Sequence, residues 1–315
     1  MLSNKVVAAK IHDYAVIGDC RTTALISRYG SVDWLCWPRF DSTAIFAAIL
    51  DPEKGGHWLI SPGSPFRAER RYLPDSNVLE THFLCGSGEA TLIDLMPVAP
   101  EEYKRTEMIP DHELTRHLIC TKGEIEIAVE FQPRVDYGRS AVRLHDHKKI
   151  GVRFESGRGV YWLRCNRPLQ LQDDCVRASI VLKQGETLEF SLSYAEESPA
   201  VLPALGQQLS NAIERSVKWW RQWAARSNYK GPYKEMVTRS ALALKLLTYS
   251  PSGAVAAAAT TSLPERIGDS LNWDYRYCWL RDASLTIRTM LGLGYMDEAE
   301  AFLTWLLHAT RLTQP

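Results

Sequence analysis

The stretch Glu124-Ile-Glu-Ile-Ala-Val-Glu-Phe131 shows most directly how the first 200 residues fold. Ile125, Ile127, Val129 and Phe131 alternate with glutamate or alanine. A period of two places all the apolar side chains on one face of a β-strand and the polar ones on the other. We therefore predict a strand with one face in a core and the other in water.

The same alternation recurs on both sides of this stretch, most clearly over Leu188–Tyr194. Further predicted strands are Thr22–Ser27, Val32–Trp37, Val78–Leu84, Ala90–Leu95, Val160–Cys165 and Val176–Leu182. Many short strands separated by turn residues, with no helix between them, indicate an antiparallel β-sandwich. We expect this domain to span residues 1–202, with Glu101–Arg105 as an ordinary loop. Trp34, Trp37 and Trp58 are expected in its core or at a domain interface, and a sugar-binding face is the alternative.

The period changes after Pro203. Apolar side chains then recur at intervals of four, four and three, as in an amphipathic helix: Leu209, Ile213, Val217 and Trp220. We predict a helical linker over residues 203–231. The breaking sequence Tyr229–Pro232 ends it, and we place the domain boundary there.

Three further helices are predicted in residues 232–315. The second carries Val237, Ala241, Leu244 and Thr248, and the third runs over Ala283–Leu291 and stops at Gly292. The fourth opens with Asp297 and Glu300 in capping-box spacing and continues through Phe302, Leu306 and Ala309. Helix after helix indicates an α-solenoid or an α/α-barrel.

Composition excludes several classes of protein. Lys plus Arg and Asp plus Glu both number 37, so the chain has no basic surplus for nucleic acid. No apolar run approaches the roughly 20 residues that a membrane span requires, and the N-terminus has no signal-peptide core. Seven cysteines without a Cys-x-x-Cys motif indicate free thiols. We therefore expect a cytoplasmic protein.

The run Asn272-Trp-Asp-Tyr-Arg-Tyr-Cys-Trp-Leu-Arg-Asp282 has a composition typical of a sugar-binding segment. Aromatic faces suit the apolar faces of sugar rings, and an Arg–Asp pair forms charge-assisted hydrogen bonds with hydroxyls. A structural interpretation stays open, in which Asp282 is the N-cap of the following helix and Arg281 lies on the surface.

This run resembles the first substrate-binding segment of glycoside hydrolase family 15, which includes glucoamylases, glucodextranases and bacterial trehalases. Other stretches are similar to the family in the same order: Tyr29–Ser42, Phe131–Arg139, Arg239–Lys245 and Thr260–Glu265. Asp269 and Leu271 depart from the pattern, where the family usually has glycine and arginine. The resemblance implies an N-terminal β-sandwich and an (α/α)6 barrel, of which residues 232–315 hold only the first helices.

The resemblance also implies a substrate site. Tyr275, Trp279, Arg281 and Asp282 match positions that bind the non-reducing-end glucose, and Trp273 is a further candidate. Arg281 and Asp282 would bind hydroxyls on the side of the ring away from the bond that is cut. A longer glucan at that end would collide with the pair, so the resemblance implies action on chain ends.

The central arginine of the run has two interpretations. Arg276 either contributes to the site, beside Asp274 and Tyr277, or pairs with Asp274 to hold the loop.

No catalytic residue is assigned. The family is inverting, with two carboxylates about 6.5–9.5 Å apart, and both lie downstream of the Arg–Asp motif. We therefore expect the 315-residue chain to be an inactive fragment. Glu298 and Glu300 are interpreted as helix-start carboxylates, and Glu265 is given no role.

We expect no cofactor and no metal. His145 and His147 flank Asp146, but Lys148 and Lys149 follow at once, which favours a solvated loop.

The preferred function is a glycosidase acting on α-glucosidic bonds in maltooligosaccharides, isomaltooligosaccharides or trehalose, so the expected partner is an α-glucoside or oligosaccharide substrate. One alternative is a disaccharide phosphorylase, which uses phosphate in place of water. Another is a non-catalytic carbohydrate-binding or structural remnant. A homo-oligomer that buries the apolar stripes of the barrel helices is left open.

Overall fold

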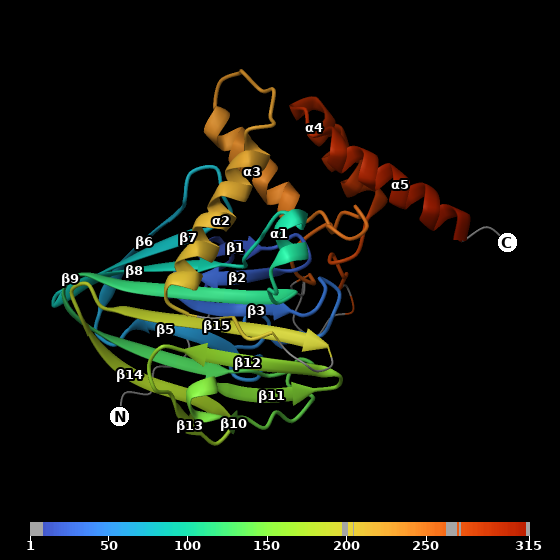
Figure 1. Cartoon of the computed structure of the whole chain (residues 1–315). Coiled ribbons are helices and arrows are strands. Elements are labelled where there is room, and N and C mark those ends of the chain that lie inside the picture. The colour runs from blue at the N-terminus through green and yellow to red at the C-terminus, as the bar shows by residue number, and fades with distance from the viewer. Residues whose placement is uncertain (1–8, 197–200, 204, 263–269, 271, 313–315) are drawn as a thin grey trace.

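The computed structural model describes residues 9–196, 201–203, 205–262, 270 and 272–312. Antiparallel strands form two layers, and helices lie to one side of them (Figure 1). No helix within these described ranges is long and apolar enough to cross a membrane. Glu265, Asp269 and Leu271, singled out from the sequence, lie outside the described residues.

One layer holds β1 Tyr14–Gly18, β2 Thr23–Ser27, β3 Ser31–Cys36, β4 Ala44–Phe46, β5 His57–Pro62, β13 Gln170–Gln172 and β14 Cys175–Lys183. The other holds β6 Phe66–Tyr72, β7 Leu79–Cys85, β8 Gly88–Leu95, β10 His145–Asp146, β11 Val152–Ser156, β12 Gly159–Cys165 and β15 Thr187–Glu196. Each strand predicted from the alternation falls on one of these strands or on β9 His112–Gln132.

The long strand β9 belongs to both layers. Its first half pairs with β8 and β15, and its second half pairs with β5 and β14. The change of layer falls at Gly123, whose φ is 66°. A Cβ there would lie 2.5 Å from the Ser87 carbonyl oxygen, so only glycine fits without displacing the neighbouring hairpin.

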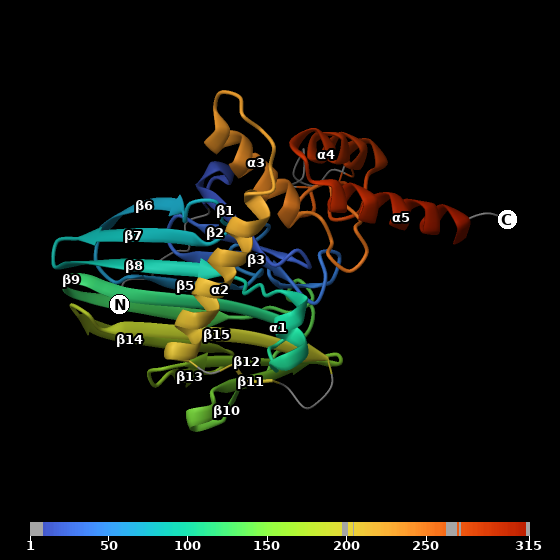
Figure 2. The same ribbon diagram turned by 45° about the horizontal axis from the view of Figure 1, so that its top comes forward.

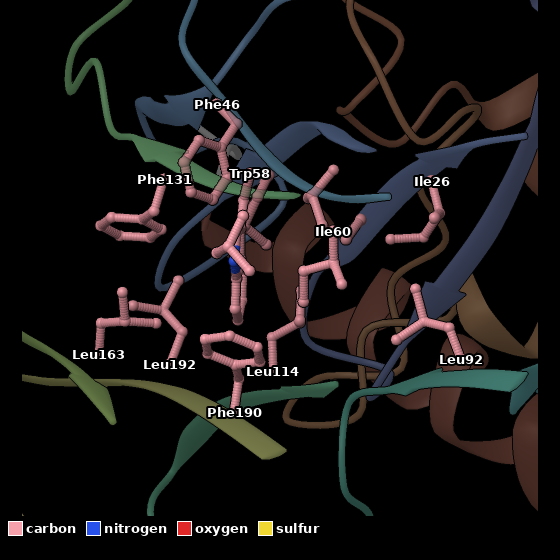
Figure 3. Packing of buried hydrophobic residues seen from close by; sticks show 14 of the residues in the cluster. Ile26, Phe46, Trp58, Ile60, Leu92, Leu114, Phe131, Leu163, Phe190 and Leu192 are labelled. Atoms are coloured by element: carbon pink, nitrogen blue, oxygen red, sulfur yellow. The ribbon is translucent and has the colours of Figure 1, made fainter. Parts of the chain in front are cut away.

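The inner faces of the two layers form one core, which fits the predicted antiparallel β-sandwich. Ile125, Ile127, Val129 and Phe131 are all buried, as the alternation predicts. Rings from opposite layers meet edge to face, with Trp58 and Phe190 centroids 5.8 Å apart (Figure 3). Trp34, Trp37 and Trp58 are buried, as expected.

The described helices are α1 Glu101–Thr106, α2 Gln207–Ala224, α3 Lys234–Leu246, α4 Leu280–Leu293 and α5 Met296–Leu312, with 3₁₀ turns η1 Ile11–Asp13 and η2 Lys148–Ile150. The predicted stripe of α2 is buried in one cluster with Val78, just before β7, and Leu95 of β8. Leu242 and Leu246 of α3 join the same cluster. By contrast, α4 and α5 project away from the sheets (Figures 1 and 2).

Helix boundaries differ from prediction: α3 ends at Leu246, before Thr248, and α4 begins at Leu280 rather than Ala283. Glu101–Arg105 is helical rather than a loop. The helix starts directly after Pro100, and an ion pair of 2.7 Å between Lys104 and Glu101 spans its first turn. Helix α4 continues through Gly292 and ends at Leu293. The next residue, Gly294, provides the C-cap with a left-handed φ of 93°.

The capping-box prediction for the fourth helix is wrong. Helix α5 already begins at Met296, so Asp297 lies inside its first turn. The Asp297 carboxylate instead pairs with Arg226 at 2.8 Å.

Candidate functional site

The aromatic segment lies along a neighbouring stretch of chain, residues 257–262. Ala258 N donates to the Tyr275 carbonyl at 2.8 Å, and Ala257 N donates to the Tyr277 carbonyl at 3.1 Å. Ser262 N donates to the Trp273 carbonyl at 2.8 Å. These bonds fix the backbone of the segment and therefore the points from which its side chains project.

Three rings of the segment form an aromatic patch, made of Trp273, Tyr275 and Trp279. The Trp279 ring lies 6.1 Å from Trp273, nearly perpendicular, and 5.4 Å from Tyr275. Trp279 Nε1 donates to the Asp274 carbonyl at 3.1 Å, which fixes the orientation of the indole. Trp273 remains 51% exposed. A rigid, exposed aromatic surface suits stacking against the apolar face of a ligand.

Arg281 and Asp282 follow the patch in the first turn of α4. Their side chains are 78% and 44% exposed, and Arg281 Nε lies 3.9 Å from Asp282 Oδ2. The N-cap of α4 is Trp279, without a side-chain capping bond, so Asp282 is not the N-cap. Asp282 Oδ2 is buried and has no hydrogen-bond partner among the described residues. The carboxylate lies near the positive end of the helix, and the side chain as a whole is partly exposed.

A cavity of about 690 Å³ lies beside the segment, between β1, β2, α3 and residues 257–262. Trp273 and Tyr275 form one wall, while Trp279, Arg281 and Asp282 do not line it. Of the five predicted site residues, two therefore line this cavity and three lie outside its lining.

The structure confirms the pairing of Arg276 with Asp274. Arg276 Nη2 and Nε lie 2.7 and 2.9 Å from the two carboxylate oxygens of Asp274. Burial alone would raise the pKa of Asp274, but the hydrogen bonds and charge of Arg276 outweigh it and hold the pKa below its usual range. Arg276 therefore stabilises the ionised form of Asp274.

Glu298 lies in the first turn of α5, as predicted, and also forms a buried contact. Its Oε1 accepts a 2.6 Å hydrogen bond from Trp223 Nε1 and lies 3.0 Å from Lys245 Nζ. Burial would raise the pKa of Glu298, but Lys245, the Trp223 hydrogen bond and Arg226 together lower it. This contact could not be predicted from the sequence, because its partners lie on α2 and α3.

The remaining polar motifs form no metal centre in the part of the chain described. Asp146, between His145 and His147, pairs with Lys148 at 3.1 Å. No group of three His, Cys, Asp or Glu side chains there is arranged to hold a metal. All seven cysteines are free thiols.

Two family profiles match this chain. The profile described as "Trehalase-like, N-terminal" matches residues 5–201, and that of "Glycosyl hydrolases family 15" matches residues 231–313. The second range contains the aromatic patch and the Arg–Asp pair. The chain belongs to glycoside hydrolase family 15, with a trehalase-like N-terminal region.

The chain is also similar to curated proteins named trehalase. That of Mycolicibacterium smegmatis is 35% identical over 94% of this chain and 47% of its own length. Those of Mycobacterium tuberculosis and Thermoplasma volcanium are each 33% identical, over 94% and 93% of this chain and 46% of their own lengths. The chain thus spans about half the length of these relatives.

A solved structure titled putative kojibiose phosphorylase, from the human microbiome, is more distant. It covers 64% of this chain and 34% of its own chain, at 10% identity and a TM-score of 0.36. A likeness this weak says nothing about the reaction.

Proposed function

We propose that the protein acts as a glycoside hydrolase on α,α-trehalose and that Tyr275, Trp279, Arg281, Asp282 and Trp273 bind its glucose. The observation that carries this proposal is the exposed aromatic patch followed directly by an Arg–Asp pair at the start of α4. The similarity to proteins named trehalase favours this disaccharide over maltooligosaccharides and isomaltooligosaccharides.

The chemistry of the two groups is complementary to a hexose. The rings of the patch offer a flat surface for the C–H face of the sugar. The exposed Arg281 guanidinium can donate to ring hydroxyls, and the partly exposed Asp282 carboxylate can accept from one. Hydrogen bonds to charged groups contribute about 1.5–3 kcal/mol each, enough to orient a sugar that stacks weakly.

An inverting hydrolysis needs a pair of carboxylates, and two carboxylates of residues 272–312 are already engaged. Asp274 is engaged by Arg276, and Glu298 is buried in its pair with Lys245. Neither is available as a general acid or base. A pair about 6.5–9.5 Å apart would protonate the glycosidic oxygen and activate a water on opposite faces of the sugar.

The test is to incubate the natural gene product with trehalose and follow the products by proton NMR. Inverting hydrolysis releases one α- and one β-glucose before mutarotation, whether or not phosphate is present. Release of glucose 1-phosphate, only with phosphate, would instead assign a phosphorylase. Failure to cleave any α-glucoside would favour the non-catalytic alternative.

The free thiols also lead us to infer a cytoplasmic location.

A further inference from the structure

The β-sandwich is in direct contact with the aromatic segment through one side chain. Arg276 Nη1 donates to the Ser42 carbonyl at 2.7 Å and also approaches the Phe40 carbonyl and Cys36 Sγ. These three acceptors lie in β3 and the loop after it, more than 230 residues earlier in the chain. The Arg276 side chain is only 8% exposed, so its charge is satisfied almost entirely by the protein.

The other edge of the same guanidinium fixes the segment itself. Arg276 binds both oxygens of Asp274, and the backbone N of Arg276 donates to Asp274 Oδ1 at 3.0 Å. The Asp274 carbonyl in turn accepts the indole N–H of Trp279. A continuous path of hydrogen bonds therefore runs from the sandwich loop through Arg276 and Asp274 to the aromatic patch.

The stretch that pairs with the segment is held by the same strand. Trp34 of β3 packs on the face of its sheet away from the main core and donates from Nε1 to the Ala259 carbonyl at 3.0 Å. The Arg276 guanidinium lies 6.0 Å from the centre of the Trp34 ring. Both backbone stretches of the site are thus fixed to β3 and its loop.

We propose that Arg276 is a positioning residue through which the β-sandwich sets the geometry of the sugar-binding patch. The N-terminal domain is then part of the binding site rather than a separate module. This inference rests on the proposed function for its effect on sugar binding. Only a planar guanidinium can bind a carboxylate with one edge and carbonyls with another, so lysine cannot replace it.

The experiment compares Arg276→Lys with Arg39→Lys. Arg39 forms the same kind of pair, two residues from Asp41 at 3.0 Å, but it is 58% exposed. We expect Arg276→Lys to weaken trehalose binding about tenfold by calorimetry, and Arg39→Lys to leave it unchanged. Amide exchange at Ala257, Ala258 and Ser262 should accelerate in Arg276→Lys but not in Arg39→Lys. Asp274→Asn should act in the same direction.

The outcomes separate the two proposals. Unchanged affinity in Arg276→Lys, or unchanged exchange at the three amides, would overturn the positioning role. A lowered melting temperature with normal affinity would assign Arg276 to folding alone. If the unsubstituted protein binds no trehalose, the proposed function fails, and the exchange rates still decide whether Arg276 positions the segment.

Discussion

The tryptophans of the β-sandwich and those of residues 272–279 differ in their surroundings. Trp58 has no exposed surface and packs against Phe131 and Phe190. Trp273 is half exposed, although a neighbouring stretch fixes its backbone. Burial of apolar surface contributes roughly 25 cal/mol per Å², so Trp58 stabilises the fold. An exposed indole on a fixed backbone gains that energy only when a ligand covers it.

The largest expected effect tests this contrast by substitution. Trp58→Ala should lower the free energy of unfolding by about 3–5 kcal/mol, because it leaves a cavity between the layers. Trp273→Ala should lower the free energy of unfolding by no more than about 1 kcal/mol, and yet weaken trehalose binding. Urea unfolding and calorimetry measure the two quantities. Equal losses of stability would show that Trp273 is a packing residue.

A second prediction concerns the charged end of the site. Asp282→Asn keeps the shape but removes a charged acceptor, whose hydrogen bonds contribute about 1.5–3 kcal/mol. In the natural gene product, kcat/KM for trehalose should fall roughly ten- to a hundredfold, with little change in melting temperature. Asp297→Asn is the matched control, since Asp297 lies in the first turn of α5. Normal kinetics with a lowered melting temperature would reduce Asp282 to a structural role.

The sequence predicted the sandwich well because strict alternation marks a strand with one buried face, as at Ile125–Phe131. It missed strands such as Phe66–Tyr72, whose charged side chains mask the alternation. The aromatic run and the Arg276–Asp274 pair were also predictable, since those residues are neighbours. The contact of Arg276 with Ser42 was not, because no periodicity tells which distant loop a side chain will touch.

The buried carboxylate on α5 provides a third, pH-dependent test. The pKa of Glu298 is lower in the folded protein than the roughly 4.3 of an unfolded chain. Its contribution to stability is therefore present above that unfolded value and is lost as pH falls through the folded pKa. The stability difference between the unsubstituted protein and Glu298→Gln should shrink as pH drops from 7 to 3.5, measured by urea unfolding. Glu300→Gln should show no such trend, and a constant difference would contradict the assignment.

The smallest effect concerns the projecting helices. Leu285 and Leu307 are exposed on α4 and α5, whereas Leu242 of α3 is buried. Leu285→Ser and Leu307→Ser should change stability by no more than about 0.5 kcal/mol. If these faces associate between copies, both variants should reduce the concentration dependence of sedimentation, while a homo-oligomer formed elsewhere would leave it unchanged.

Indole resonances give the most direct test of the central claim that residues 272–282 form a sugar-binding surface. Trehalose is titrated into the protein, and the Nε1–H signals of Trp273, Trp279, Trp34 and Trp58 are followed by NMR. The account predicts saturable shifts at Trp273 and Trp279 and none at Trp58, with both shifts lost in Asp282→Asn. Saturable binding that leaves Trp273 and Trp279 unmoved would contradict it.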